Sequence, residues 1–266
     1  RRRYARQSNH LFSPGRFSGN VAEMTEKKGE SPIIQVKNLY KVYQVGETKV
    51  FALNGVSFSL NKGEFCAVVG PSGSGKSTLL NMMAGLEKPS KGEIIIAGTH
   101  IEKMTEKQLV TFRRQNVGFI FQSYNLIKTM NAVENVAMPL TFRGVPKKIR
   151  TEKAKKYLKL VGLEKQMDHM ANEMSGGQQQ RVGIARALVV DPRIIFADEP
   201  TGNLDSKTTM DVLRLMRRIV KERKQTLIMV THDNHLAGFA DKQIHIVDGK
   251  ILKIEEQHHE DEEELK

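Results

Sequence analysis

The chain has 266 residues, 39% of them hydrophobic, so it can bury a core as one domain with an embedded subdomain. Its longest apolar runs, about five or six residues, fall far short of the roughly 20 that span a bilayer, so we expect no membrane-spanning helix. The formal net charge of +12 is compatible with nucleic acid, an anionic membrane surface or nucleotide phosphates as partners. The single cysteine excludes a disulfide within the chain and fits a reducing cytoplasmic setting.

The two ends of the chain differ from the middle in composition. Residues 1–30 carry +4, are rich in Arg, Ser, Gly and Asn, and show no hydrophobic period, so we predict a disordered leader. Met24 begins a segment typical of a natural start, so residues 1–23 are interpreted as upstream sequence. Residues 255–266 carry −6 and are predicted to form a solvated acidic tail, which leaves +14 on the body, mostly on solvated helix faces.

The first part of the body has the pattern of β-strands. Apolar segments with period two or full burial are Ile33–Lys37, Val56–Leu60, Phe65–Val69 and Gly92–Ala97. Asn54-Gly55 and Asn61–Gly63 are read as turns between them. We therefore expect a small antiparallel sheet beside a central parallel sheet.

A glycine-rich loop, Gly70–Thr78, joins the strand Phe65–Val69 to a helical pattern. It matches Gly-x-x-x-x-Gly-Lys-[Ser/Thr], in which backbone N–H groups and the helix N-terminus surround phosphates. A glycine turn without a ligand is disfavoured because the lysine, the hydroxyl, the strand and the helix are all present. The predicted phosphate-binding residues are Gly70, Pro71, Ser72, Gly73, Ser74, Gly75, Lys76, Ser77 and Thr78.

A stretch without strand patterns follows the helix Met104–Gln115 and the strand Val117–Phe121. Its helical segments are Asn131–Met138, Lys147–Val161 and Glu164–Asn172. Residues 123–190 are therefore predicted to form an inserted helical subdomain. The segment Lys147–Val161 is basic on one side and apolar on the other, as in an amphipathic surface helix.

Strands alternate with a helix in the last third of the chain, which indicates α/β architecture with a parallel sheet and right-handed crossovers. The strands are Arg193–Asp198, Thr226–Thr231 and Gln243–Val247, and the helix is Lys207–Lys224.

Three of the predicted strands end in polar residues, at the sheet edge where ligands of parallel sheets bind. Gln122 follows Val117–Phe121, and His232 follows Thr226–Thr231. Asp198 is the last residue of the third strand. Asp198 can hold Mg²⁺, and Glu199, next in the chain, can polarise an attacking water. Each such residue alone would be read as an ordinary polar group, but several beside one phosphate loop indicate a reaction centre. We predict Glu199, His232, Gln122 and Lys76 as catalytic residues and Ser77, Gln122 and Asp198 as metal ligands.

A second anion-binding helix end is predicted within the helical insert. In Met174–Arg181, Ser175 is a good N-cap and two glycines expose backbone N–H groups. Because this helix end belongs to the insert, the natural interpretation is a site completed by a second copy of the chain. The residues concerned are Ser175, Gly176, Gly177 and Gln178.

Over about Ile33–Ile254 the sequence resembles the nucleotide-binding domain of ABC transporters. Gly70–Thr78 is similar to the Walker A motif, Ile194–Glu199 to Walker B, and Met174–Gln178 to the signature motif with Met in place of Leu. Further matches are Gln122 with the Q-loop, Gly202–Asp205 with the D-loop, His232 with the switch histidine, and Tyr43 (with Tyr40 as its rival) with the adenine-stacking aromatic. The resemblance implies a P-loop NTPase (RecA-like) core with an N-terminal antiparallel β subdomain and an inserted α-helical subdomain, over residues 31–254.

Shorter segments, among them Glu199–Asp205 and Glu134–Pro139, resemble the macrolide-export, lipoprotein-release and antimicrobial-peptide branch. The resemblance implies ATP and Mg²⁺ as cofactors, a second ABC subunit, most simply in a homodimer, and a transmembrane permease. The chain would then be peripheral, at the cytoplasmic face of the membrane. Lys128–Asn131 lacks the proline that relatives carry nearby, in a stretch expected to face the permease.

Three other classes compete with this interpretation. A soluble ABC ATPase of DNA repair or translation would use the basic body on nucleic acid, but the chain has one cassette and no heptad run. A regulator with an inactive site is disfavoured by the intact Lys76, Asp198, Glu199 and His232, and a kinase or GTPase by the signature helix. Direct nucleic-acid contact is therefore not expected. The cargo and the permease are not identified by the sequence.

Overall fold

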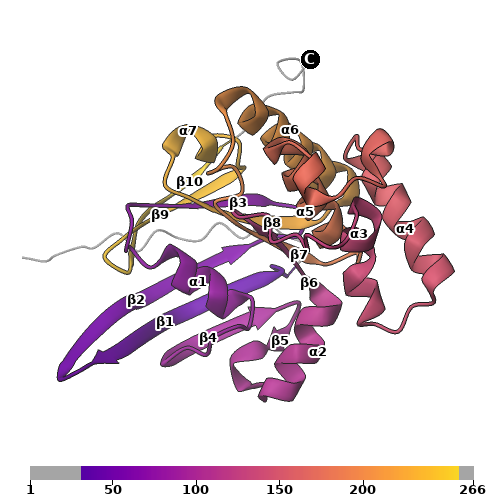
Figure 1. The fold of residues 1–266 in the computed structure, drawn as a ribbon. Helices are drawn as coiled ribbons and strands as arrows, with labels where there is room; N and C mark the ends of the chain where they lie inside the picture. Colours follow the sequence, from indigo (N-terminus) through magenta and orange to yellow (C-terminus); the bar gives the residue numbers. More distant parts are fainter. Residues whose placement is uncertain (1–30, 258–266) are drawn as a thin grey trace, which may run out of the picture. The chain divides into compact units, whose positions relative to one another are not determined.

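The computed structural model describes residues 31–257 (Figure 1). The predicted leader and residues 258–266 of the predicted tail lie outside the described residues. A six-stranded sheet has the order β10-β9-β3-β8-β7-β6, in which β10 alone is antiparallel to its neighbour. Its strands are β3 (Phe65–Val69), β6 (Val117–Phe121), β7 (Ile194–Asp198), β8 (Thr226–Thr231), β9 (Lys242–Val247) and β10 (Lys250–Glu256). The predicted α/β class is confirmed.

A four-stranded antiparallel sheet, β2-β1-β4-β5, forms the N-terminal part, as expected. Its strands are β1 (Ile34–Val45), β2 (Thr48–Leu60), β4 (Lys91–Ile96) and β5 (Thr99–His100). The turn expected at Asn54-Gly55 is wrong, because β2 continues through it. Leu39 pairs with Val56 and Tyr40 with Asn54, so Gly55, at φ +77°, is the extra residue of a β-bulge.

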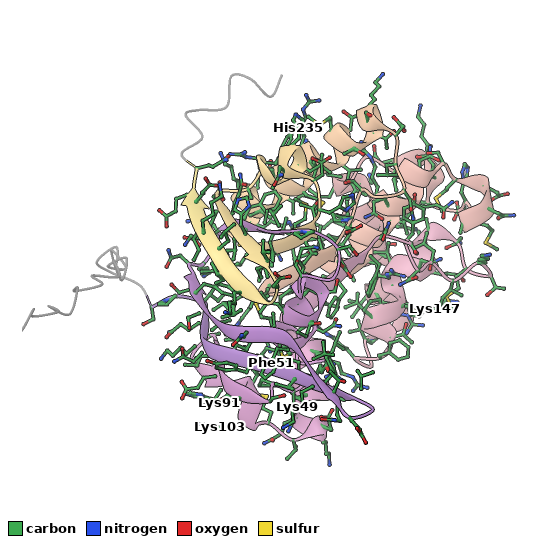
Figure 2. All side chains as sticks on the ribbon, turned by 90° about the vertical axis from the view of Figure 1, so that its left-hand side faces the viewer. Lys49, Phe51, Lys91, Lys103, Lys147 and His235 are labelled. Atoms are coloured by element: carbon green, nitrogen blue, oxygen red, sulfur yellow. The ribbon has the colours of Figure 1, made fainter. Side chains whose placement is uncertain are left out.

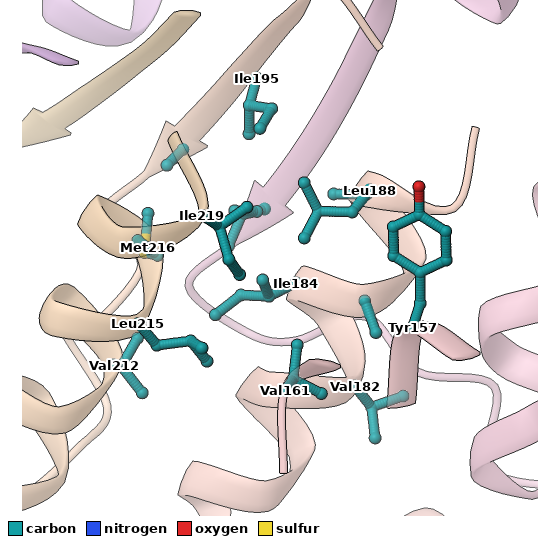
Figure 3. Close-up of a cluster of buried hydrophobic side chains, with 14 of the residues drawn as sticks. Tyr157, Val161, Val182, Ile184, Leu188, Ile195, Val212, Leu215, Met216 and Ile219 are labelled. Carbon is teal, nitrogen blue, oxygen red and sulfur yellow. The ribbon is translucent and has the colours of Figure 1, made fainter. Parts of the chain in front are cut away.

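The central strand β3 divides the core into two hydrophobic clusters. Phe65, Ala67 and Val69 face one cluster, and Cys66 and Val68 face the other, as alternation along a strand requires. Helices fill the first cluster, where Tyr157, Ile184 and Ile219 come from three of them (Figure 3). The antiparallel sheet and the helix α1 (Lys76–Met83) fill the second. Cys66 is buried in this second cluster, and burial raises the pKa of its thiol far above its usual value.

Seven α-helices connect the strands of the described chain. They are α1 (Lys76–Met83), α2 (Glu106–Asn116), α3 (Ala132–Thr141), α4 (Lys147–Leu160), α5 (Gly176–Leu188), α6 (Ser206–Arg223) and α7 (Asn234–Ala237). The helix α5 packs against both α3 and α4 of the insert and also against β6, so it belongs to both parts. Lys147, at the basic start of α4, points outward (Figure 2). Within residues 31–257 no helix is long and apolar enough to cross a membrane.

The predicted helix Glu164–Asn172 is wrong. This segment contains only the short 3-10 helices η2 (Glu164–Gln166) and η3 (Ala171–Glu173). The reason is tertiary, because the residues between them bond to the start of α3. The carbonyls of His169 and Met167 accept from the N–H groups of Ala132 and Val133, at 3.0 and 3.1 Å.

The predicted start of the acidic tail at residue 255 is also wrong. The strand β10 continues through Glu256, and Gln257 N–H still donates to the Asp241 carbonyl, at 2.8 Å. Basic groups on β9 compensate the two acids: His245 lies 2.9 Å from Glu255, and Lys242 lies 3.4 Å from Glu256.

Candidate functional site

The glycine-rich loop lies between β3 and α1 and packs closely against β9 and β2. A Cβ at Gly70 would lie 2.0 Å from the Ile246 carbonyl oxygen, and one at Gly75 would lie 2.3 Å from the Ala52 carbonyl oxygen. Gly75 also has φ +98°, where a side chain is strained. Glycine is therefore required at both ends of the loop, which fixes the path of its backbone.

The Lys76 ammonium lies inside the arch of this loop. It donates to the carbonyls of Gly70 and Pro71, at 2.8 and 2.7 Å, and only 7% of the residue is exposed. Burial lowers the pKa of Lys76, and the nearby carboxylates of Glu199 and Asp198 oppose this shift. A second polar group of the loop, the Ser74 hydroxyl, is buried without a hydrogen-bond partner among residues 31–257. The loop thus holds a cation and an unsatisfied hydroxyl where phosphates would bind.

Ser77 and Asp198 come together from α1 and from the end of β7. The Ser77 hydroxyl lies beside the Asp198 carboxylate. Burial raises the pKa of Asp198, with a further contribution from Glu199, while Ser77 and Lys76 act in the opposite direction. The pair offers two oxygens beside the glycine loop. No group of three His, Cys, Asp or Glu side chains in the described part of the chain could hold a metal ion alone.

Glu199 and His232 face each other at the same sheet edge. Nδ1 of His232 lies 3.0 Å from Oε1 of Glu199. Glu199 has φ +42°, an uncommon conformation for this residue, and its N–H donates to the Val230 carbonyl at 3.0 Å. The backbone thus turns sharply after Asp198, so the two consecutive carboxylates have different surroundings.

Gln122 follows β6 but does not join this group directly. A Cβ at Gly202 would lie 2.6 Å from Nε2 of Gln122, so the two residues are in close contact. The Gln122 carbonyl accepts from Asn203 Nδ2 at 3.1 Å. No hydrogen bond within residues 31–257 links the Gln122 side chain to Asp198 or to the glycine loop.

The segment Ser175–Gln178 forms a capped helix start away from the glycine loop. Ser175 Oγ accepts from Gln178 N–H at 3.3 Å, and Gln178 Oε1 accepts from Ser175 N–H at 2.9 Å. A Cβ at Gly177 would lie 2.4 Å from Cγ2 of Thr208 on α6. In the described chain no hydrogen bond or ion pair joins this segment to Gly70–Thr78, so the structure does not bring the two predicted phosphate sites together.

Asp205 caps the start of α6. Its carboxylate accepts from the Thr208 N–H and hydroxyl, at 3.1 and 2.5 Å. These hydrogen bonds lower the pKa of Asp205. Within this chain Asp205 therefore has a structural partner.

Of the two candidate tyrosines, Tyr43 is the one beside the glycine loop. Its hydroxyl donates to the Glu87 carboxylate at 2.8 Å, and the side chain of Thr78, at the end of the loop, lies beside it. Tyr40 instead packs on Gly55, whose Cβ would lie 3.1 Å from its hydroxyl.

Three features of the site region were not predicted from the sequence. Gln180 is fully buried and donates to the carbonyl of Pro200, next to Glu199, at 2.5 Å. Arg186 is buried beside the residues that follow Gln122. A groove of about 490 Å³ lies among α2, β6, α3 and α5, lined by Arg113, Arg114, Val117, Gly118, Phe119, Phe121, Asn125, Met138, Pro139, Phe142, Arg143, Arg186, Ala187 and Val190. For Gln180 and Arg186, the available signal in the sequence was a polar residue at a core-facing position of the amphipathic helix α5.

Comparison with known proteins assigns this arrangement to a family. Residues 53–202 match the family described as ABC transporter. The chain belongs to the ABC transporter family. It is 46% identical to an ABC transporter ATP-binding protein of Thermotoga maritima over 84% of this chain and 95% of that protein. It is also 46% identical to the macrolide export ATP-binding/permease protein MacB of Chlorobium phaeobacteroides, over 85% of this chain but only 34% of MacB.

A solved ABC cassette has the same fold. The dimeric cassette MJ0796 of Methanocaldococcus jannaschii, in a post-hydrolysis state bound to ADP and Pi, superposes with a TM-score of 0.78 and 40% identity. The match covers 85% of this chain and 99% of MJ0796. The predicted family, P-loop ABC fold, ATP binding and ATP hydrolase activity are confirmed, and the chain is an ABC transporter ATPase subunit.

Proposed function

We propose that this ATPase subunit works as a head-to-tail pair that drives an export-type membrane permease. Each ATP would lie between Gly70–Thr78 of one copy and Ser175–Gln178 of the other. The observation that carries the proposal is that both helix starts are preformed, yet no bond within the described chain connects them. A two-fold pair of copies completes two equivalent sites. The dimeric form of MJ0796 supports this arrangement.

The residues at the sheet edge would have different roles in hydrolysis. Lys76 and the loop N–H groups would hold the phosphates, and Glu199, oriented by His232, would take the proton of the attacking water. Ser77 and Asp198 would hold Mg²⁺, which suits a cation that takes one or two protein oxygens together with phosphates and water. Mg²⁺ would supply charge neutralisation at the phosphates. Gln122 would join the metal site on closure, and Asp205 would lie near the partner's nucleotide.

The groove beside β6 is proposed as the permease contact. Among the described residues it is lined by four arginines, one asparagine and apolar residues, with no Asp or Glu. This chemistry suits an apolar segment that carries a carboxylate. The buried Asn135 of α3 bonds to the backbone of Ile127, Met130 and Asn131, and these bonds hold the loop between β6 and α3 beside the groove. Contact with the permease would place the chain at the cytoplasmic membrane face, and the similarity to MacB favours export.

Replacing Phe142 by Asp should release the permease. Phe142 lines the groove and is 64% exposed, so the substitution alters the contact surface without opening the core. A tagged chain purified from solubilised membranes should recover about tenfold less permease when it carries Phe142→Asp. The matched control is Phe51→Asp, which alters an exposed aromatic on the antiparallel sheet (Figure 2) and should change nothing. Equal recovery with both variants contradicts the assignment, and recovery of nucleic acid that falls with salt would favour the soluble ABC ATPase instead.

Replacing Tyr43 by Ala should weaken ATP binding about tenfold, the usual loss when a base–aromatic stack is removed. Tyr43→Phe keeps the ring and loses only the hydroxyl, with its bond to Glu87 and its contact with Thr78, so its Kd should stay within about twofold. Tyr40→Ala serves as the control, because Tyr40 packs on Gly55. Calorimetric titration with Mg-ATP measures all three Kd values. A larger loss for Tyr40→Ala than for Tyr43→Ala would reverse the assignment.

A further inference from the structure

Arg186 is a buried cation without a carboxylate partner. It lies on α5, it is 7% exposed, and no Asp or Glu within residues 31–257 forms an ion pair with it. Its guanidinium donates to two backbone carbonyls instead, that of Asn125 at 2.5 Å and that of Tyr124 at 2.7 Å. A buried charge is costly unless its bonds are strong and specific. The hydrogen bonds to these two carbonyls are therefore what compensates the burial of the Arg186 charge.

The two carbonyls belong to a strained turn directly after Gln122. Tyr124 has φ +58° and Asn125 has φ +49°, so two consecutive residues with side chains are left-handed. Such conformations persist only where surrounding contacts hold them, and they concentrate at functional sites. The forked guanidinium can satisfy both carbonyls at once, which an ammonium cannot do with the same geometry.

The same turn also contacts the beginning of α5. A Cβ at Gly183 would lie 3.8 Å from the Tyr124 carbonyl oxygen. A Cβ at Gly176 would lie 2.9 Å from the Tyr124 hydroxyl. The turn therefore runs along α5, from Arg186 to the N-terminus that Ser175 caps. Arg186 and Asn125 also both line the groove.

We propose that Arg186 is a positioning residue for ATP hydrolysis: it locks the left-handed turn at Tyr124-Asn125 to α5, so that Gln122 and Ser175 move as one unit. Arg186 is not placed among the groups that touch the nucleotide, so it acts on the rate through Gln122. The inference rests on the proposed function, because it requires Gln122 to take part in the reaction.

The test is the steady-state kinetics of Arg186→Lys in the full chain with Mg-ATP. We expect kcat to fall about tenfold and KM for ATP to change less than about twofold, because the geometry of Gln122 is disturbed while the phosphate site is not. In a Gln122→Ala background the same substitution should have no further effect on kcat. The control is Arg217→Lys, since Arg217 is 6% exposed, donates to the Phe239 carbonyl at 3.0 Å, pairs with Asp241 at 3.8 Å and is not among the residues assigned to the site.

Arg217→Lys should lower the melting temperature about as much as Arg186→Lys but leave kcat unchanged. The inference is overturned if Arg186→Lys keeps the parent kcat, if it lowers kcat equally in the Gln122→Ala background, or if Arg217→Lys lowers kcat as much. A normal kcat for Gln122→Ala alone is a different result. That result would exclude Gln122 from the proposed mechanism and would therefore also exclude the proposed role of Arg186.

Discussion

Glu199→Gln should lower the ATPase rate ~10³-fold, within the usual range for the loss of a general base, while ATP still binds. The substitution is isosteric, so the left-handed backbone at φ +42° and the contact to His232 at 3.0 Å can both persist. The amide cannot accept the proton of the attacking water. Because hydrolysis is blocked after ATP has closed the dimer, the variant should accumulate as an ATP-bound dimer.

Phosphate release measures the rate, and light scattering after gel filtration in Mg-ATP measures the dimer. The control is Glu102→Gln, which alters another Glu–His pair, with His100 Nδ1 at 2.8 Å from Glu102 Oε1, remote from the glycine loop. It should hydrolyse ATP at the parent rate and remain in exchange between monomer and dimer. If Glu199→Gln stays monomeric in saturating Mg-ATP and hydrolyses at the parent rate, the role assigned to Glu199 is wrong.

The parts of the site that the sequence predicted are those that local pattern determines. Asp198 and His232 lie at one edge of the sheet, because each comes at the end of a short apolar run and parallel strands bring such ends together. The glycine loop was recognisable for the same reason. Its spacing lies within one strand–loop–helix unit.

The parts that were missed depend on contacts between distant segments. The local pattern Asn54-Gly55 predicts a turn, but the place of Gly55 in a bulge is set by pairing with β1. The helix expected at Glu164–Asn172 does not form, because backbone carbonyls of this segment accept from the start of α3 instead. Arg186 resembles any charged residue of a surface helix until Asn125, 61 residues earlier, is placed against it.

The same distinction between local features and long-range contacts applies to the two phosphate sites. Each is predictable because it is local, and each is formed within the described chain. Their proposed pairing is a relation between two copies, so it is tested with two different variants in one dimer.

Ser175→Asp should abolish hydrolysis without harming its own helix. Asp caps a helix as well as Ser does, and a negative charge suits the N-terminus of α5, so Gln178 N–H keeps its acceptor. Across the interface, however, the carboxylate would face the γ-phosphate of the partner's ATP and repel it. Ser175→Asn, which keeps a cap without the charge, should lose less activity. Melting temperatures close to that of the parent would show that the fold is intact.

Mixing Ser175→Asp with Lys76→Met then tests the head-to-tail arrangement, because each variant alone should be inactive. In a mixed dimer, one site combines the two altered segments, and the other combines the intact Lys76 of one chain with the intact Ser175 of its partner. Random pairing makes half of the dimers mixed, so an equal mixture should regain about a quarter of the parent rate. If each ATP were served by both segments of one chain, mixing would restore nothing. Lys76→Met mixed with itself at twice the concentration controls for simple mass action.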